Sequence, residues 1–162
     1  MPSYTVATEK KSYQRKFQAL CDQFIKKTNG SQFLKKHTKI VDNLLIKLWI
    51  DSDVSKKNTL IAVGGYGRNE LFPYSDVDIL VLNIEKSIDN DENISQFITK
   101  CWDIGLKIGH SVRNLAEVKE EFNADISTAT NLLEARLIYG SSDLYLKFNS
   151  TINKIINIKK FF

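Results

Sequence analysis

Two aspartates separated by one residue, Asp76 and Asp78, stand at the start of the apolar segment Val77–Leu82. The segment is short and β-branched, which is typical of a buried strand. Side chains alternate between the two faces of a strand, so both carboxylates should lie on one face, about 7 Å apart along the backbone. Two like charges beside an apolar strand need an opposing charge, and a hard divalent cation with oxygen ligands supplies it. We therefore predict that Asp76 and Asp78 bind Mg²⁺ and act in catalysis there.

A pair of glycines, Gly64 and Gly65, follows the preceding apolar segment, residues 59–63. Glycine lets the main chain approach a ligand closely, and the exposed amides of such a turn favour a phosphate group. Arg68 and Ser75 have side chains that can contact phosphate oxygens. Together with the aspartates these residues predict a site for a nucleoside triphosphate, in which metal ions neutralise the charge that builds as the α-phosphate is attacked and pyrophosphate departs.

Each of these features has a simpler interpretation when it stands alone. Two glycines after a strand usually form only a turn, and Ser-Asp-Val-Asp is more often a capped turn than a metal site. The combination is more specific, because ten residues separate the glycines from an Asp-x-Asp that opens a second strand. Two other phosphate-binding patterns are excluded: the chain has no Gly-x-x-x-x-Gly-Lys, and Glu70 stands where a dinucleotide fingerprint needs a small residue.

The period of the apolar residues predicts the elements that must position these side chains. Helices are expected at residues 9–27, 31–51, 94–108, 116–122 and 127–139, with a short one from "YGRNEL" and another in the C-terminal stretch. The helix at 127–139 should be capped by Asp125 or Ser127 and close at Gly140. Strands are expected at residues 59–63 and 77–82 and within "KIGHSVRNL", residues 107–115.

This order predicts an α+β fold in which a small mixed sheet is flanked by helices, with an N-terminal helical pair and C-terminal helices. We divide the chain into a helical segment at 1–57, a core that carries the chemistry at 58–140, and a helical segment at 141–162. The C-terminal segment stops without a cap or a polar tail, so we expect the chain to be part of a longer multidomain protein.

The composition fits a soluble globular protein, with 43% hydrophobic and 26% charged residues and a net charge of +4. The basic residues are spread along the chain, so we interpret them as a solvated face and expect neither nucleic acid nor membrane as a partner. Cys21 and Cys101 have no partner at metal-ligand spacing and are expected to be free thiols in a reducing compartment. No segment resembles a signal peptide or a membrane span. We predict a cytoplasmic protein.

Three segments together carry a resemblance to a known family: "VGGYGRNELFPYSDVDILVL", "CWDIGLKIGHSVRNLAEV" and "DISTATNLLEARLIYG". The Gly-Gly and Asp-x-Asp arrangement resembles the DNA polymerase β-type nucleotidyltransferase superfamily. Within it, the three segments are similar to the N-terminal domain of the bacterial protein-PII uridylyltransferase/uridylyl-removing enzymes. The resemblance runs from about residue 58 to the end of the chain.

The resemblance implies a polymerase β-like fold and the transfer of UMP from UTP to a tyrosine of the PII signalling protein, with release of pyrophosphate, in the regulation of nitrogen metabolism. It also implies that an HD-type domain removes UMP and that glutamine is sensed by ACT domains, neither of which lies in this chain. By position, Gly64 and Gly65 would cradle phosphate, Ser75 would touch it, and Asp76 and Asp78 would bind Mg²⁺.

One departure from the superfamily leaves alternatives open. Its members commonly place a third carboxylate on a neighbouring strand, where "KIGHSVRNL" has His110 and no acid, while Asp103 and Glu117 lie on either side without matching in position. The third ligand then comes from elsewhere, or the acceptor is activated otherwise, with His110 either as a base or in a structural role. Adenylyl transfer to another acceptor, and a non-catalytic nucleotide-binding regulatory module, are the alternative functions.

Overall fold

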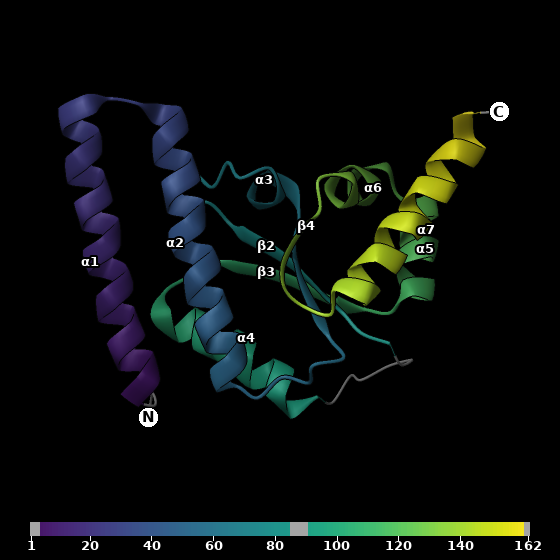
Figure 1. Ribbon diagram of the computed structural model, residues 1–162, viewed down its shortest axis with the longest axis horizontal. Helices are drawn as coiled ribbons and strands as arrows, with labels where there is room; N and C mark the ends of the chain where they lie inside the picture. The colour runs from purple at the N-terminus through teal and green to yellow at the C-terminus, as the bar shows by residue number, and fades with distance from the viewer. Residues whose placement is uncertain (1–3, 85–90, 161–162) are drawn as a thin grey trace. The chain divides into compact units, whose positions relative to one another are not determined.

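The computed structural model describes residues 4–84 and 91–160, and the chain forms two compact units. One unit comprises Met1–Val54, Asn69–Val77 and Asn90–Gly109, and the other comprises Ser55–Arg68, Asp78–Asp89 and His110–Phe162. Within the described residues the chain has seven helices and four strands, whose course is shown in Figure 1. The predicted α+β class is confirmed.

The first unit contains the predicted N-terminal helical pair, α1 (Tyr4–Lys27) and α2 (Gly30–Asp51), which lie side by side (Figure 1). Asn29 between them caps α2 by accepting a hydrogen bond from the Gln32 amide, so the second helix can begin directly after a short turn. Helix α4 (Glu92–Ile104) packs against both. It ends earlier than predicted because Gly105, at a φ of +101°, adopts the left-handed conformation that closes a helix.

Helix α2 also holds the loop that leads to Asp76. The buried imidazole of His37 has its Nδ1 2.8 Å from the Leu71 carbonyl oxygen, and the Thr38 hydroxyl accepts a hydrogen bond from the Leu71 amide at 3.3 Å. Because a carbonyl only accepts, Nδ1 carries the proton, and Nε2 is left to accept from the Tyr13 hydroxyl at 3.3 Å. Both polar groups of Leu71 are thus satisfied by neighbouring residues of α2.

A four-stranded mixed sheet has the order β3-β2-β1-β4, with β1 Thr59–Ala62, β2 Val77–Leu82, β3 Ile108–Arg113 and β4 Arg136–Gly140. β1 is antiparallel to both of its neighbours, and its register on β2 pairs Ile61 with Leu80. β3 is parallel to β2, because amides at both ends of β2 donate to carbonyls in the same order along β3, Val77 to Lys107 and Asn83 to Arg113.

The fourth strand corrects the predicted helix at 127–139. Helix α6 covers only Ile126–Leu133, and the chain then enters β4 through Glu134. The segment "RLIYG" is apolar and partly β-branched, so its pattern fits a helix or a strand, and the pairing of β4 with β1 decides for the strand. Gly140 ends the strand rather than a helix.

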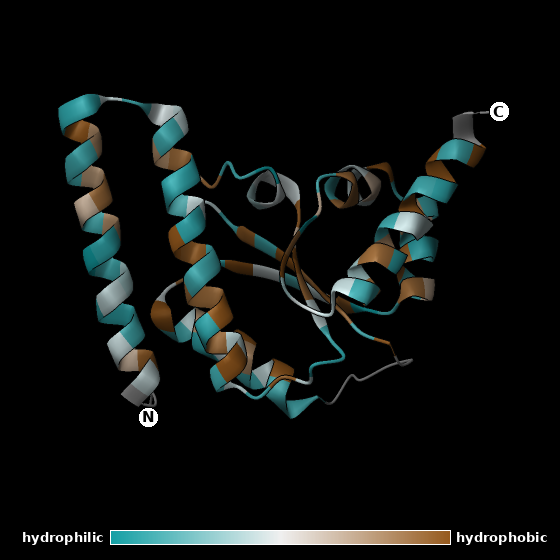
Figure 2. Cartoon of the chain, in the orientation of Figure 1, coloured by the Kyte–Doolittle hydropathy of each residue, from teal (hydrophilic) through white to brown (hydrophobic). Residues whose placement is uncertain are grey.

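Helices of the second unit build its core with one face of the sheet, and hydrophobic residues run along the strands in Figure 2. The core joins side chains of β1 and β2 to α5 (Leu115–Ala124), α6 and α7 (Ser142–Lys160): Ile61, Val63, Leu80, Leu82, Val118, Phe122, Leu132, Leu144, Phe148, Ile152 and Ile155. Asp78 belongs to the same alternating set as Leu80 and Leu82, so it lies on the face that these helices cover.

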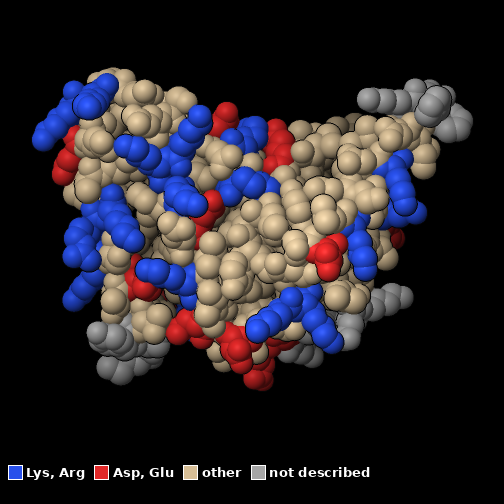
Figure 3. Space-filling view, viewed as in Figure 1, with Lys and Arg blue, Asp and Glu red and all other residues tan. Residues whose placement is uncertain are grey.

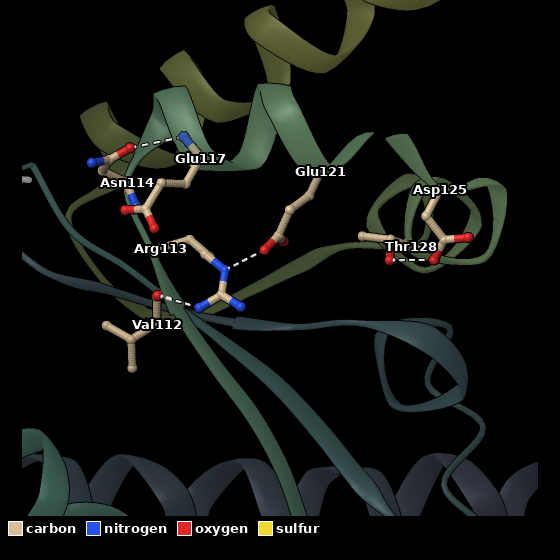
Figure 4. A network of polar contacts seen from close by, with 7 residues as sticks. All are labelled: Val112, Arg113, Asn114, Glu117, Glu121, Asp125 and Thr128. Carbon is tan, nitrogen blue, oxygen red and sulfur yellow. Dashed lines mark hydrogen bonds and ion pairs between the residues drawn. The ribbon is translucent and has the colours of Figure 1, made fainter. Parts of the chain in front are cut away.

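Side-chain caps fix where α5 and α6 begin (Figure 4). Asn114 and Glu117 form a capping box at α5, and Asp125 caps α6 by accepting from the amides of Ser127 and Thr128. The Thr128 hydroxyl also donates to Asp125 at 2.8 Å, and these hydrogen bonds, the hydroxyl's first, lower the pKa of the Asp125 carboxyl. Of the two predicted caps, Asp125 is therefore the one used.

Helix α3 (Gly64–Gly67) is fastened to the segment that enters β4. A methyl group added to Gly67 would collide with the Glu134 carbonyl oxygen and lie 3.0 Å from that of Ala62. The Arg136 guanidinium donates to the Tyr66 carbonyl oxygen at 3.1 Å and lies 5.2 Å from the centre of the Tyr66 ring. The backbone of α3 therefore packs directly against the backbone at the end of α6.

The basic residues of the helical pair lie on the surface, as predicted. In Figure 3, lysine and arginine side chains gather over α1 and α2, and most of the residues concerned are exposed: Lys10, Lys11, Arg15, Lys16, Lys26, Lys27 and Lys35. Among the described residues, no helix combines the length and the apolar composition needed to cross a membrane.

The burial of His37 predicts a pH dependence of stability. Burial lowers the pKa of His37 below the ordinary value of 6.5, and the hydrogen bond to Leu71 opposes that shift only in part. Below about pH 6.5, His37 binds a proton in the unfolded chain but not in the folded chain. The free energy of unfolding therefore falls as the pH is lowered toward the folded-state pKa of His37. Denaturant midpoints measured between about pH 7.5 and 5.5 should show this slope.

His37→Asn keeps an N–H group near the Nδ1 position but does not titrate, so its slope should be flatter than that of the wild type. Equal slopes for the wild type and His37→Asn would show that His37 does not titrate differently in the folded chain.

The contact of Gly67 predicts a large effect of a single methyl group. Gly67→Ala should lower the free energy of unfolding by roughly 1–3 kcal/mol or more, because the new Cβ meets backbone that cannot turn away. Gly30→Ala is the matched control: its Cβ points into open space at the start of α2, and it should change stability by less than about 1 kcal/mol, toward stabilisation. A wild-type denaturation midpoint for Gly67→Ala would contradict this packing.

Candidate nucleotide and metal site

The glycine pair lies at the corner where β1 ends. Val63 is extended and precedes α3, which begins at the glycines themselves rather than at Tyr66 as predicted. Gly64 has a φ of +59°, in the left-handed region that a side chain disfavours. Gly64 is buried and Gly65 partly buried, and the first N–H groups of a helix have no acceptor within the helix.

Asp78 lies next to this corner because of the sheet. The Val63 amide donates to the Asp78 carbonyl oxygen at 3.0 Å, which continues the antiparallel pairing of β1 and β2 one step beyond β1. Gly64 follows directly, and a methyl group built on it would lie 3.4 Å from Asp78 Oδ2. The half-buried carboxylate therefore faces the bare backbone of Gly64. The structure brings these two predicted site residues together.

Asp76 and Ser75 precede β2, which begins at Val77 as predicted. Asp76 is exposed and stands two residues before Asp78. Ser75 is exposed as well, and its hydroxyl donates to the Phe72 carbonyl oxygen at 2.8 Å, so it closes its own turn. The neighbouring Tyr74 has a φ of +62°, which makes this a sharply bent entry to the strand.

Arg68, predicted to contact phosphate, forms an ion pair with Glu134. Its side chain is 46% exposed, and it lies at the end of α3, three residues after Gly65. Exposed ion pairs contribute about 1 kcal/mol or less, so this one holds the guanidinium near the corner without committing it strongly. Glu134 was not singled out by its sequence, because an acidic residue within a helical pattern is ordinary.

A second residue without a sequence signal, Asn131, also faces the corner. The methyl group built on Gly64 would lie 3.5 Å from Asn131 Oδ1, on α6. Asn131 appears in the sequence as one polar residue of an amphipathic helix. Only the packing of α6 against α3 reveals that it lies beside Asp78 and Gly64.

Two carboxylates are a suitable donor set for a hard divalent cation, since Mg²⁺ is usually bound by one or two carboxylates together with water and substrate phosphates. Within residues 4–84 and 91–160, no group of three or more His, Cys, Asp or Glu side chains is placed to hold a metal ion. Glu117, one of the two acids that flank the segment of β3 in the sequence, takes part in the capping box of α5. His110 lies exposed on β3.

Comparisons with known proteins give a match to one family and similarity to curated enzymes. Residues 45–108 match the family described as "Nucleotidyltransferase domain", and this stretch contains both the glycine corner and the two aspartates. Curated bifunctional uridylyltransferase/uridylyl-removing enzymes are 42% identical over 141 residues in Nitrosospira multiformis and 43% identical over 145 residues in Hydrogenovibrio crunogenus. A third, from Burkholderia vietnamiensis, is 44% identical over 131 residues.

These alignments cover 83%, 86% and 80% of this chain, but only 16%, 16% and 15% of the relatives. A solved structure, "Crystal structure of the toxin-antitoxin with AMP-PNP", matches 74% of this chain and 90% of its own with 17% identity and a TM-score of 0.48, a likeness too low to carry an argument. The family match and the relatives agree with the predicted nucleotidyltransferase fold. Residues 45–108 therefore match the nucleotidyltransferase domain family, and over most of its length the chain is similar to one part of bifunctional uridylyltransferase/uridylyl-removing enzymes.

Proposed function

We propose that this chain carries the Mg²⁺-dependent transfer of UMP from UTP to a tyrosine of the PII signalling protein, with release of pyrophosphate, in the cytoplasm. The observation that supports this most directly is the Asp78 carboxylate facing the Gly64 backbone. Uridylyl transfer is taken from the names of the relatives. PII as acceptor and Mg²⁺ as cofactor come from the resemblance of the motifs, and glutamine would act only through domains outside this chain.

Different groups of the chain would bind the phosphates and the metal. The amides of Gly64 and Gly65 would hold phosphate oxygens, and Arg68 can turn from Glu134 to a phosphate because the ion pair is exposed and weak. Asp76 and Asp78 would hold Mg²⁺, which when bound offsets negative charge on the reacting phosphates. Ser75 would have to release the Phe72 carbonyl before its hydroxyl could reach a phosphate.

The transfer itself exchanges one phosphorus–oxygen bond for another. The tyrosine oxygen would form a bond to the α-phosphorus as the bond to pyrophosphate breaks; pyrophosphate leaves with the electron pair of that bond, and the hydroxyl proton passes to solvent. A tyrosine hydroxyl has an ordinary pKa near 10, far below the value of about 16 for water, so it needs less help to lose its proton. A phenolic acceptor therefore suits a site whose described residues offer two carboxylates rather than three.

The same observation favours a second candidate. Without a third carboxylate among the described residues, a nucleotide-binding module that does not catalyse transfer would have the same corner and the same acidic pair. Adenylyl transfer to a different acceptor is the other alternative, since no described residue is assigned to the base. Binding of UTP is common to the first two, whereas pyrophosphate release distinguishes them.

Asp78→Asn is the test of the proposed reaction. Loss of one charge at the metal site should lower the rate of UMP transfer by about 100-fold or more, because the group acts on charge that develops in the reaction. Transfer of label from α-labelled UTP to PII and release of pyrophosphate should be measured in the intact protein, with thermal unfolding as a check on folding.

Asp143→Asn, an exposed acid in the first turn of α7, is the matched control and should transfer UMP at the wild-type rate. Undiminished transfer by a folded Asp78→Asn protein would eliminate the catalytic assignment. UTP, ATP, GTP and CTP compared side by side should show a preference for UTP, and a preference for ATP would replace the uridylyl assignment by the adenylyl one.

A further inference from the structure

Two polar side chains from different elements face the same bare Cα atom. A methyl group on Gly64 would lie 3.4 Å from Asp78 Oδ2 on β2 and 3.5 Å from Asn131 Oδ1 on α6. The two oxygens therefore cannot lie farther apart than the sum of these distances. Both distances are ordinary van der Waals contacts, so another atom can take the position of the absent methyl group beside the buried Gly64.

The position of Asn131 is defined by the ends of its helix. Asp125 caps α6 at its start, and the backbone of Glu134 at its end packs on Gly67 of α3 (Figure 4 shows the cap). Helix α6 is thus anchored on both sides of Asn131, and it packs against α3. The placement of Asn131 opposite Asp78 follows from these contacts rather than from a contact of its own side chain.

The Asn131 side chain contributes little to the stability of the fold. It is exposed, and among the residues that the structure describes it has no hydrogen-bond partner. The polar residues around it differ, because the hydroxyls of Thr128 and Thr130 bond to Asp125 and to the Ile126 carbonyl. Asparagine is also a poorer helix former than alanine, so an unpartnered asparagine inside α6 costs some helix stability.

A side-chain amide is chemically suited to bind a phosphate group of a triphosphate. Asp78 attracts a cation but repels phosphate, whereas a neutral amide adds no negative charge and can donate a hydrogen bond to a phosphate oxygen. The terminal amide turns about its last bond, so its nitrogen can take the place of its oxygen at the corner. An aspartate at the same position would place a second carboxylate beside Asp78 and oppose the phosphates.

We infer that Asn131 binds the phosphate chain of the nucleotide, with its side-chain amide donating to a phosphate oxygen held at the Gly64 corner opposite Asp78. This inference rests on the proposed nucleotide site and adds to it a contact from α6.

Binding measured by calorimetry on the intact protein tests the contact without relying on catalysis. Asn131→Ala should weaken the binding of Mg·UTP about tenfold, the effect of losing one hydrogen bond to a charged group. The same loss should appear with inorganic tripolyphosphate and Mg²⁺, because the contact is to phosphate. The melting temperature should stay the same or rise, since alanine is the better helix former.

Asn153→Ala is the matched control, because it makes the same change at an exposed asparagine of α7 and should leave affinity unchanged. Asn131→Asp should bind Mg·UTP more weakly than Asn131→Ala, while its affinity for Mn²⁺ alone should not fall. Asn131→Asp keeps the size of the side chain and its position on α6. Weaker binding by this variant therefore reports repulsion between its carboxylate and the phosphates.

Wild-type affinity of a folded Asn131→Ala protein for Mg·UTP would overturn the inference, and so would a loss confined to UTP and absent with tripolyphosphate. If Asp78→Asn still abolishes transfer in either case, the proposed function stands without Asn131. If the wild-type protein binds neither UTP nor tripolyphosphate, the proposed function and the inference fail together.

Discussion

The hydrogen bond from the Val63 amide to the Asp78 carbonyl is the contact on which the rest of the site depends. It closes the antiparallel pairing of β1 and β2 at the point where β1 turns into α3, and so it sets Gly64 beside Asp78. A slip of one residue in this register would move Asp78 to the opposite face of the sheet. The register is held by the apolar pair Ile61 and Leu80, which is buried in the core of the second unit.

The glycines of this corner serve different purposes. Gly64 keeps a Cβ out of the space faced by Asp78 and has a backbone conformation that favours glycine, whereas Gly67 lets the backbone of α3 touch the backbone at Glu134. The absence of a Cβ at Gly64 leaves a position beside Asp78 unfilled, whereas at Gly67 it is a requirement of packing. Because Arg68 pairs with Glu134 at the same junction, the end of α6 both supports α3 and holds a cationic side chain near the corner.

The two aspartates are positioned by different means. Asp78 is part of a strand and inherits its place from the sheet, while Asp76 ends a loop whose Leu71 is held through both backbone groups by α2. A strand residue is fixed by hydrogen bonds on both sides, whereas a loop residue depends on its nearest anchor. His37 and Thr38, which provide that anchor, therefore hold the loop that leads to Asp76, although neither has a sequence pattern that suggests such a role.

The sequence by itself determined the strands that flank the glycines and the aspartates, and the helical pair, because each rests on a local apolar period. The placement of Gly64 beside Asp78 was decided by the antiparallel register of β1 and β2. The sequence could not separate α6 from β4, since an apolar run with one β-branched residue fits both, and the choice lies in hydrogen bonds to β1 more than 70 residues earlier in the chain. Glu134 and Asn131 became visible only in the tertiary structure. A single charged or amide side chain on a helix surface does not form a periodic pattern in the sequence. Its neighbours depend on how the helices pack against one another.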